Sequence, residues 1–200
     1  KARVLITNPR LIKTVHEVLG ELHDIERVIV VNKGKSPYTF MDREIGYEGL
    51  MDKAPDEFKT VKTNREDYAI MHYTSGTTGK PKGVQRDTGG HAVALTASMQ
   101  HIYCGEAGDT MFTTSDIGWV VGHSYIVYAP LMRGMTTIVY EGVPIRPDPG
   151  IWWKIVQDYK VAVMFSSPTA IRVLKKQDPA FMRKYDTRTL KYLFLAGDPR

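Results

Sequence analysis

The chain has 200 residues, with 27 lysines and arginines against 22 aspartates and glutamates, and 42% of its residues are hydrophobic. This balance is ordinary for a globular protein and excludes a disordered chain. No apolar run approaches the roughly 18 residues that a membrane-spanning helix needs, so no membrane partner is expected. The single cysteine excludes an internal disulfide framework or a cysteine-based zinc cluster. It fits a reducing compartment, the cytoplasm or the mitochondrial matrix.

The elements expected along the chain alternate between short apolar runs and helix-length amphipathic runs. This alternation predicts an α/β fold with largely parallel sheets. Strands are expected at residues 4–7, 28–31, 69–73, 110–114, 136–140, 161–165 and 192–196. Helices are expected at residues 11–22, 47–51, 90–103, 121–132, 150–159 and 168–176. Ser167 has the form of an N-cap before a helix that starts with proline, and Pro130 is expected to bend or end its helix.

The chain divides into two parts in this scheme. Residues 1–66 hold the end of a β-α-β subdomain and a connecting region, and residues 67–200 hold the second set of strands and helices. The first residue is not methionine, and the last residues follow directly on a strand and a glycine. We therefore expect an internal piece of a longer chain.

The most informative stretch, residues 73–83, follows directly on an expected strand. It holds three glycines, four serines or threonines and two lysines within eleven positions. Glycines allow the backbone to approach a ligand closely, free amide groups bind anions, and lysines attract phosphate. The spacing is not that of a Walker A loop, because only Thr77 and Thr78 separate Gly76 from Gly79, and Pro81 follows Lys80. The residues therefore indicate a polyphosphate-binding loop of another kind.

The run Thr-Ser-Gly-Thr-Thr-Gly-Lys-Pro-Lys-Gly at residues 74–83 resembles the signature loop of the acyl-adenylate-forming superfamily. Further matches occur at residues 86–90, 115–125, 140–142, 167–172 and 195–199. Together they resemble the short-chain acyl-CoA synthetases, and propionyl-CoA synthetases most of all. The resemblance is specific over residues 67–200 and extends only to the layout over residues 1–66. It implies part of the large N-terminal domain of an AMP-forming acyl-CoA synthetase.

The resemblance implies a two-step reaction. The carboxylate of a short acid attacks the α-phosphate of ATP to give acyl-AMP, and coenzyme A then displaces AMP. ATP, Mg²⁺ and coenzyme A would serve the full enzyme. The residues implied in nucleotide binding are Thr74, Ser75, Gly76, Thr77, Thr78, Gly79, Lys80, Gly197, Asp198 and Pro199. The acyl pocket would use Trp119, Val120, Val121 and Ala196, and Ser167 would border coenzyme A.

Two departures limit what this chain alone is expected to do. The family commonly has glutamate where Asp198 stands, so the resemblance implies backbone contacts at this position and not a contact through the shorter carboxylate. The Thr-Glu motif for Mg²⁺, the Asp and Arg that hold the ribose, and the C-terminal domain with its adenylation lysine all lie outside the chain. No metal ligand and no confident catalytic residue is therefore expected here, and these 200 residues alone are expected to be inactive.

Three hypotheses stay open at this point. The first is a synthetase acting on propionate or a similar acid such as acetate, because Ala196 is small and leaves room for a short chain. The second is the ligase module of a multifunctional enzyme acting on 3-hydroxypropionate. The third is a non-enzymatic nucleotide- or nucleic-acid-binding protein, suggested by the net charge of +5. Acidic residues such as Asp178 and Asp186 interrupt the basic stretch near the end, which favours a solvated helix face over a nucleic-acid surface.

Overall fold

The computed structural model describes residues 2–32, 37–74 and 82–196, and it separates into two compact units, residues 1–61 and 62–200. The first unit contains a three-stranded parallel sheet in the order β1-β2-β3, with two helices. Its elements are β1 (Val4–Thr7), α1 (Ile12–Leu19), β2 (Arg27–Val30), β3 (Glu44–Gly46) and α2 (Tyr47–Met51). The side chains of Ile12, Ile25, Val28 and Val30 form its core.

The short strand β3 corrects the expectation that residues 33–66 hold only a connection and one helix. Its first residue, Glu44, is a buried carboxylate that accepts hydrogen bonds from the Tyr38 hydroxyl at 2.8 Å and the Met41 amide at 2.8 Å. His16 Nε2 lies 2.6 Å from the same carboxylate. A strand of three residues that begins with a charged group carries no apolar alternation, so its sequence gave no strand signal.

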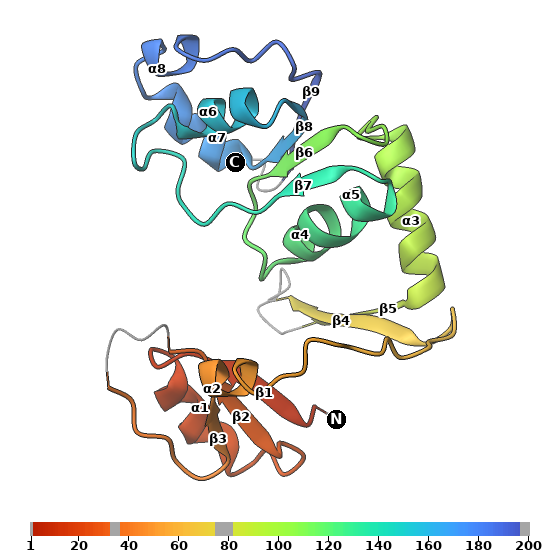
Figure 1. Ribbon diagram of the computed structural model, residues 1–200, viewed down its shortest axis with the longest axis vertical. Coiled ribbons are helices and arrows are strands. Elements are labelled where there is room, and N and C mark those ends of the chain that lie inside the picture. The colour runs from red at the N-terminus through yellow and green to blue at the C-terminus, as the bar shows by residue number, and fades with distance from the viewer. Residues whose placement is uncertain (1, 33–36, 75–81, 197–200) are drawn as a thin grey trace. The chain divides into compact units, whose positions relative to one another are not determined.

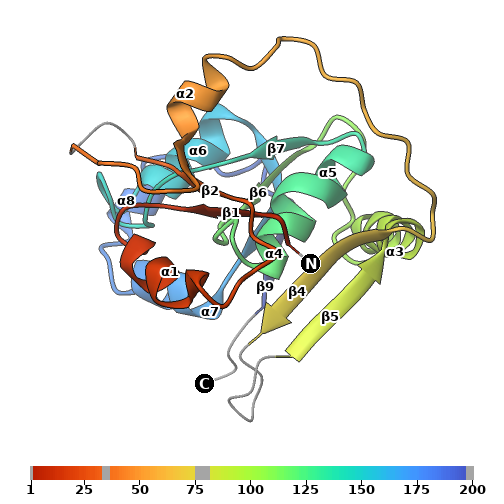
Figure 2. The ribbon, with the colours of Figure 1, turned by 90° about the horizontal axis from the view of Figure 1, so that it is seen from below.

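The second unit contains an antiparallel pair, β4-β5, and a four-stranded parallel sheet in the order β7-β6-β8-β9. Strand β5 leads directly into α3 (Figure 2), and the Asp87 carboxylate accepts the Gly90 amide as the N-cap of that helix. The elements before the parallel sheet are β4 (Tyr68–Thr74), β5 (Lys82–Asp87) and α3 (Thr88–His101). Those of the sheet and its connections are β6 (Thr110–Thr113), α4 (Val120–Gly122), η1 (His123–Tyr128), α5 (Ala129–Met132), β7 (Thr136–Ile138), α6 (Ile151–Asp158), β8 (Val161–Ser166), α7 (Pro168–Lys175), α8 (Ala180–Arg183) and β9 (Tyr192–Leu195).

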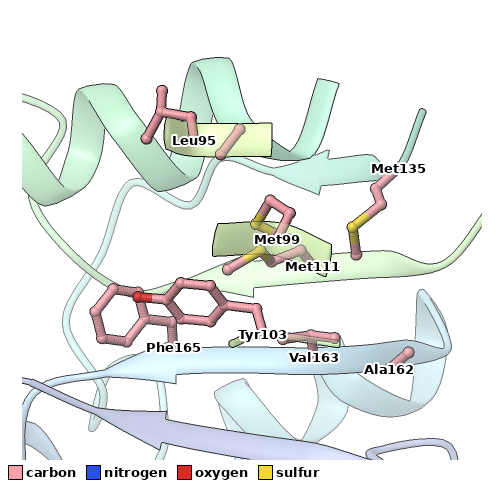
Figure 3. Close-up of a cluster of buried hydrophobic side chains, with 9 residues drawn as sticks. Leu95, Met99, Tyr103, Met111, Met135, Ala162, Val163 and Phe165 are labelled. Atoms are coloured by element: carbon pink, nitrogen blue, oxygen red, sulfur yellow. The ribbon is translucent and has the colours of Figure 1, made fainter. Parts of the chain in front are cut away.

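Helices cover both faces of the parallel sheet. Figure 1 shows α3, α4 and α5 on one face and α6 and α7 on the other. Successive residues of the central strands point to opposite faces, as the strand period of two requires. Met111 and Val163 pack with α3 in the first core (Figure 3), whereas Phe112 and Met164 pack with α6 in the second. Strand β8 is buried at all six positions, which explains its continuous apolar sequence.

The segment expected as one helix at residues 121–132 has a different form. A π-helical segment, η1, joins α4 to α5, and Pro130 lies inside α5 without ending the helix. Proline has no amide hydrogen, so neither an α-helical nor a π-helical register can supply a donor from residue 130 to the carbonyl groups of Ile126 or Tyr125. Two threonines supply donors instead. The Thr113 hydroxyl donates to Tyr125 O at 2.8 Å, and the Thr137 hydroxyl donates to Ile126 O at 2.6 Å.

Across the part of the chain that the structure describes, no helix combines the length and apolar character needed to cross a membrane.

Candidate active site

The strand order places a topological switch point between β6 and β8. From β6 the chain first winds outward to β7, through α4, η1 and α5. It then crosses back over β6 through α6 to form β8, and continues through α7 to β9. Connections that leave two adjacent parallel strands in opposite directions open a crevice at the carboxyl ends of those strands, where open α/β sheets bind ligands.

A cavity of about 230 Å³ lies at this switch point. Its walls come from the carboxyl ends of β6 and β8, from the residue after β9 and from the start of α4. It is lined by Thr114, Ser115, Asp116, Trp119, Val121, Phe165, Ser166, Ser167 and Ala196. The structure thus brings together four residues that the sequence singled out, namely Trp119, Val121, Ser167 and Ala196. Val120, the first residue of α4, is half-buried and does not line this cavity.

Hydroxyl groups line one side of the cavity. The Thr114 hydroxyl donates to Ser166 Oγ at 2.8 Å, across the ends of β6 and β8. Ser167 is the N-cap of α7, because its Oγ accepts the Ala170 amide at 3.2 Å, as its sequence predicted. A serine that accepts in this way can still donate its own hydrogen to a ligand. The positive end of the α7 dipole therefore lies at the cavity wall, where it favours an anionic group.

Apolar and aromatic groups form the rest of the wall. Phe165 is buried and packs against Tyr103 of the first core at a ring distance of 5.2 Å (Figure 3), so the first core lies behind this side of the cavity. Asp116 is the one charged group among the described lining residues. A small cavity with an apolar wall and a row of hydroxyls suits a short molecule with one apolar and one polar end.

A larger cavity of about 500 Å³ lies next to this one, at the carboxyl ends of β6 and β7. The two cavities share the loop Thr114, Ser115 and Asp116 as a common wall. We assign the site to the smaller cavity because the switch point lies between β6 and β8, whereas β6 and β7 are joined by a single crossover.

Among the nucleotide-binding residues expected from the sequence, Thr74 alone lies within the described part of the chain. Thr74 is the last residue of β4, and its backbone pairs with Lys82 of β5. The remaining expected nucleotide-binding residues lie outside the described residues, namely Ser75, Gly76, Thr77, Thr78, Gly79, Lys80, Gly197, Asp198 and Pro199. Their roles stay predictions.

The chain belongs to the AMP-binding enzyme family, whose pattern it matches over residues 1–200. It is 52% identical over 181 residues to a propionate–CoA ligase of Salmonella typhimurium, covering 88% of this chain and 28% of the ligase. It is 67% identical over 127 residues to a propionate–CoA ligase of Escherichia coli, covering 64% of this chain and 20% of the ligase. The chain therefore spans less than a third of the length of these relatives.

A solved structure, that of a Brucella canis acyl-CoA synthetase, has the same fold. The match covers all of this chain and 34% of the other, with a TM-score of 0.77 and 24% sequence identity. This likeness confirms the expected fold class, an α/β arrangement with largely parallel sheets.

Sequence reasoning missed five of the lining residues, namely Thr114, Ser115, Asp116, Phe165 and Ser166. A signal was present, because polar residues end both apolar strand runs, Thr113 and Thr114 at the end of β6 and directly after it, and Ser166 at the end of β8. Carboxyl ends of strands are where α/β folds place ligands, but only the strand order shows that these two ends are neighbours.

Proposed function

We propose that the complete enzyme is an AMP-forming short-chain acyl-CoA synthetase that activates propionate. The carboxylate of the acid attacks the α-phosphate of ATP, giving propionyl-AMP and pyrophosphate, and the thiol of coenzyme A then displaces AMP to give the thioester. The observation that carries this proposal is the cavity at the switch point, which unites Trp119, Val121 and Ala196 in a volume of about 230 Å³. The similarity to two propionate–CoA ligases supports the same substrate.

The residues around the cavity have distinct proposed roles. Trp119 and Val121 line the pocket for the acyl chain, with Val120 beside them at the start of α4. The small side chain of Ala196 leaves room for the terminal methyl group of the acid. Ser167, at the N-terminus of α7, borders the path of coenzyme A. The loop from Thr74 to Lys80 holds the β- and γ-phosphates and stabilises the charge that grows on the leaving pyrophosphate. Gly197, Asp198 and Pro199 pass along the adenine, and Mg²⁺ is bound by parts of the enzyme beyond this chain.

An acid panel on the full-length protein tests this proposal. Pyrophosphate release with ATP and coenzyme A is measured for acetate, propionate, 3-hydroxypropionate and butyrate. The highest kcat/KM is expected for propionate. A preference for 3-hydroxypropionate would instead favour the ligase module of a larger enzyme, an alternative that the hydroxyls of Thr114 and Ser166 in the wall support. Release with none of the four acids would contradict the synthetase assignment.

The nucleotide role is tested separately by Lys80→Ala and Gly79→Val in the full-length protein. Both variants are expected to weaken ATP binding in calorimetry, because one removes a point charge and the other blocks close backbone approach. Binding of oligonucleotides that falls with salt, together with a lack of ATP binding, would favour a nucleic-acid-binding protein. We place the enzyme in the cytoplasm, as its single cysteine suggests.

A further inference from the structure

Trp119 lies at the cavity wall and is not a member of the hydrophobic core clusters that the described residues form. Its side chain is 65% exposed, whereas the other two tryptophans, Trp152 and Trp153, are 2% and 9% exposed. A wall that limits the length of the acyl chain must nevertheless keep a fixed position, because the acids to be distinguished differ by only one methylene group. The backbone that carries Trp119 is one source of that fixed position.

The turn at residues 116–119 supplies it through Asp116. The Asp116 side chain accepts the Gly118 amide at 2.7 Å through Oδ1, and its carbonyl oxygen accepts the Trp119 amide at 3.1 Å. The carbonyl of Trp119 then accepts the His123 amide at 3.1 Å, which continues the chain into the helix. Asp116 therefore holds the amide groups of two successive residues, Gly118 and Trp119.

Gly122 allows the same turn to lie in close contact with α4. A Cβ atom built at Gly122 would overlap the Asp116 carbonyl oxygen and would lie 2.5 Å from Ile117 Cα. Both of these are backbone atoms, so a larger residue could be accommodated only by moving the turn. Gly122 is buried, and the backbone of α4 thus lies directly on the backbone of the turn.

We propose that Asp116 and Gly122 are positioning residues that set the place of Trp119 and thereby the chain length that the acyl pocket accepts. This inference rests on the proposed function, because it takes Trp119 as a wall of the acyl pocket. Neither residue is required to touch the reacting atoms. Asp116 acts through its hydrogen bond to the Gly118 amide, and Gly122 acts through the space that its missing side chain leaves.

The test compares kcat/KM for propionate and butyrate in the full-length enzyme. Asp116→Ala removes the acceptor for the Gly118 amide, and Gly122→Ala displaces the turn. Each variant is expected to lower the ratio of kcat/KM for propionate over butyrate by about fivefold or more, which is within the discrimination that one methylene group can give. Asp116→Asn keeps an oxygen that can accept the same amide and is expected to restore most of the ratio.

A matched control is available at the start of α6. Asp148 accepts the Gly150 amide at 2.7 Å through Oδ1, which is the same kind of turn, and it does not line the cavity at the switch point. Asp148→Ala is expected to leave the ratio at its wild-type value. An unchanged ratio in both Asp116→Ala and Gly122→Ala would overturn the inference while leaving the proposed function standing. Equal losses in Asp116→Ala and Asp116→Asn would also overturn it, since the charge would then matter and not the turn.

A second measurement does not depend on activity. Amide hydrogen exchange over residues 114–123 of the full-length protein is expected to speed up in Asp116→Ala and Gly122→Ala, and not in Asp148→Ala. Unchanged exchange would overturn the positioning role. Inactivity on every acid would contradict the proposed function, and the exchange measurement would still test the positioning role in that case.

Discussion

The hydroxyl of Thr114 donates to Oγ of Ser166 at 2.8 Å, although 52 residues separate the two along the chain. The bond joins the carboxyl ends of β6 and β8 at the point where the connections of the sheet diverge. It adds a side-chain bond to the backbone pairing of these strand ends, where the Thr114 amide donates to Phe165 O at 2.9 Å.

Removing this bond is expected to loosen the site. Thr114→Val and Ser166→Ala should each destabilise the full-length enzyme by about 1 kcal/mol in urea unfolding, the net value of one such hydrogen bond. Because both changes remove the same bond, the double variant should lose less than the sum of the single losses. Strict additivity would show that the two hydroxyls do not act together.

Enlarging Ala196 is expected to change the acid that is preferred. Ala196→Val adds two methyl groups at the cavity wall, where propionate would place its terminal methyl group. The ratio of kcat/KM for acetate over propionate should rise about tenfold or more, in line with roughly 1–3 kcal/mol for one methylene in a pocket. Ala196→Gly serves as the control, because it adds no volume. An unchanged ratio in Ala196→Val would place the acyl chain elsewhere.

Thr113 is expected to be important for stability through the π-helical segment. Its side chain is buried, and its hydroxyl donates to the Tyr125 carbonyl that Pro130 cannot serve. Thr113→Val keeps the shape but removes the donor, so it should lower the free energy of unfolding by about 1–3 kcal/mol. Thr113→Ser keeps the donor and should lose less. The measurement is urea unfolding of the full-length protein, and a larger loss in the serine variant would contradict this role.

Glu44 is expected to make the first unit sensitive to acid. Burial by itself would raise the pKa of this carboxyl, but hydrogen bonds from His16, the Met41 amide and Tyr38 outweigh it and lower the pKa below its ordinary value of 4.5. Since the folded pKa is the lower one, the stabilisation is complete above about pH 4.5 and is lost as the pH falls through the folded value.

The measurement for Glu44 is the free energy of unfolding between about pH 6 and about pH 3. These two pH values bracket the ordinary pKa of a carboxyl group, which is roughly 4. Glu44→Gln should be less stable than wild type at the upper end, and the difference should shrink toward the lower end. The control is Glu17→Gln, at an exposed position on α1. A difference that stays constant with pH would show that Glu44 stabilises through shape and not through charge.

Much of the local structure could be predicted from the sequence. The strand at residues 4–7 has the expected bounds, and the others that were expected are found within one or two residues. The N-cap at Ser167 is also confirmed, because capping needs only the side chain and an amide three residues on. At Pro130 the helix is irregular, as expected: a π-helical segment precedes the proline and α5 ends at Met132, while Thr113 and Thr137 supply donors to the carbonyl groups of Tyr125 and Ile126.

The sequence by itself determined most of the local elements, the phosphate-loop composition and the family, since each depends on residues that are close along the chain, whereas β3, β5 and the π-helical segment were found only in the structure. Only the tertiary structure decided that the strands are ordered β7-β6-β8-β9. That order depends on how buried faces of distant segments pack, and a window of neighbouring residues does not contain it. It is this order that brings Thr114 to Ser166 and gathers Trp119, Ser167 and Ala196 around one cavity.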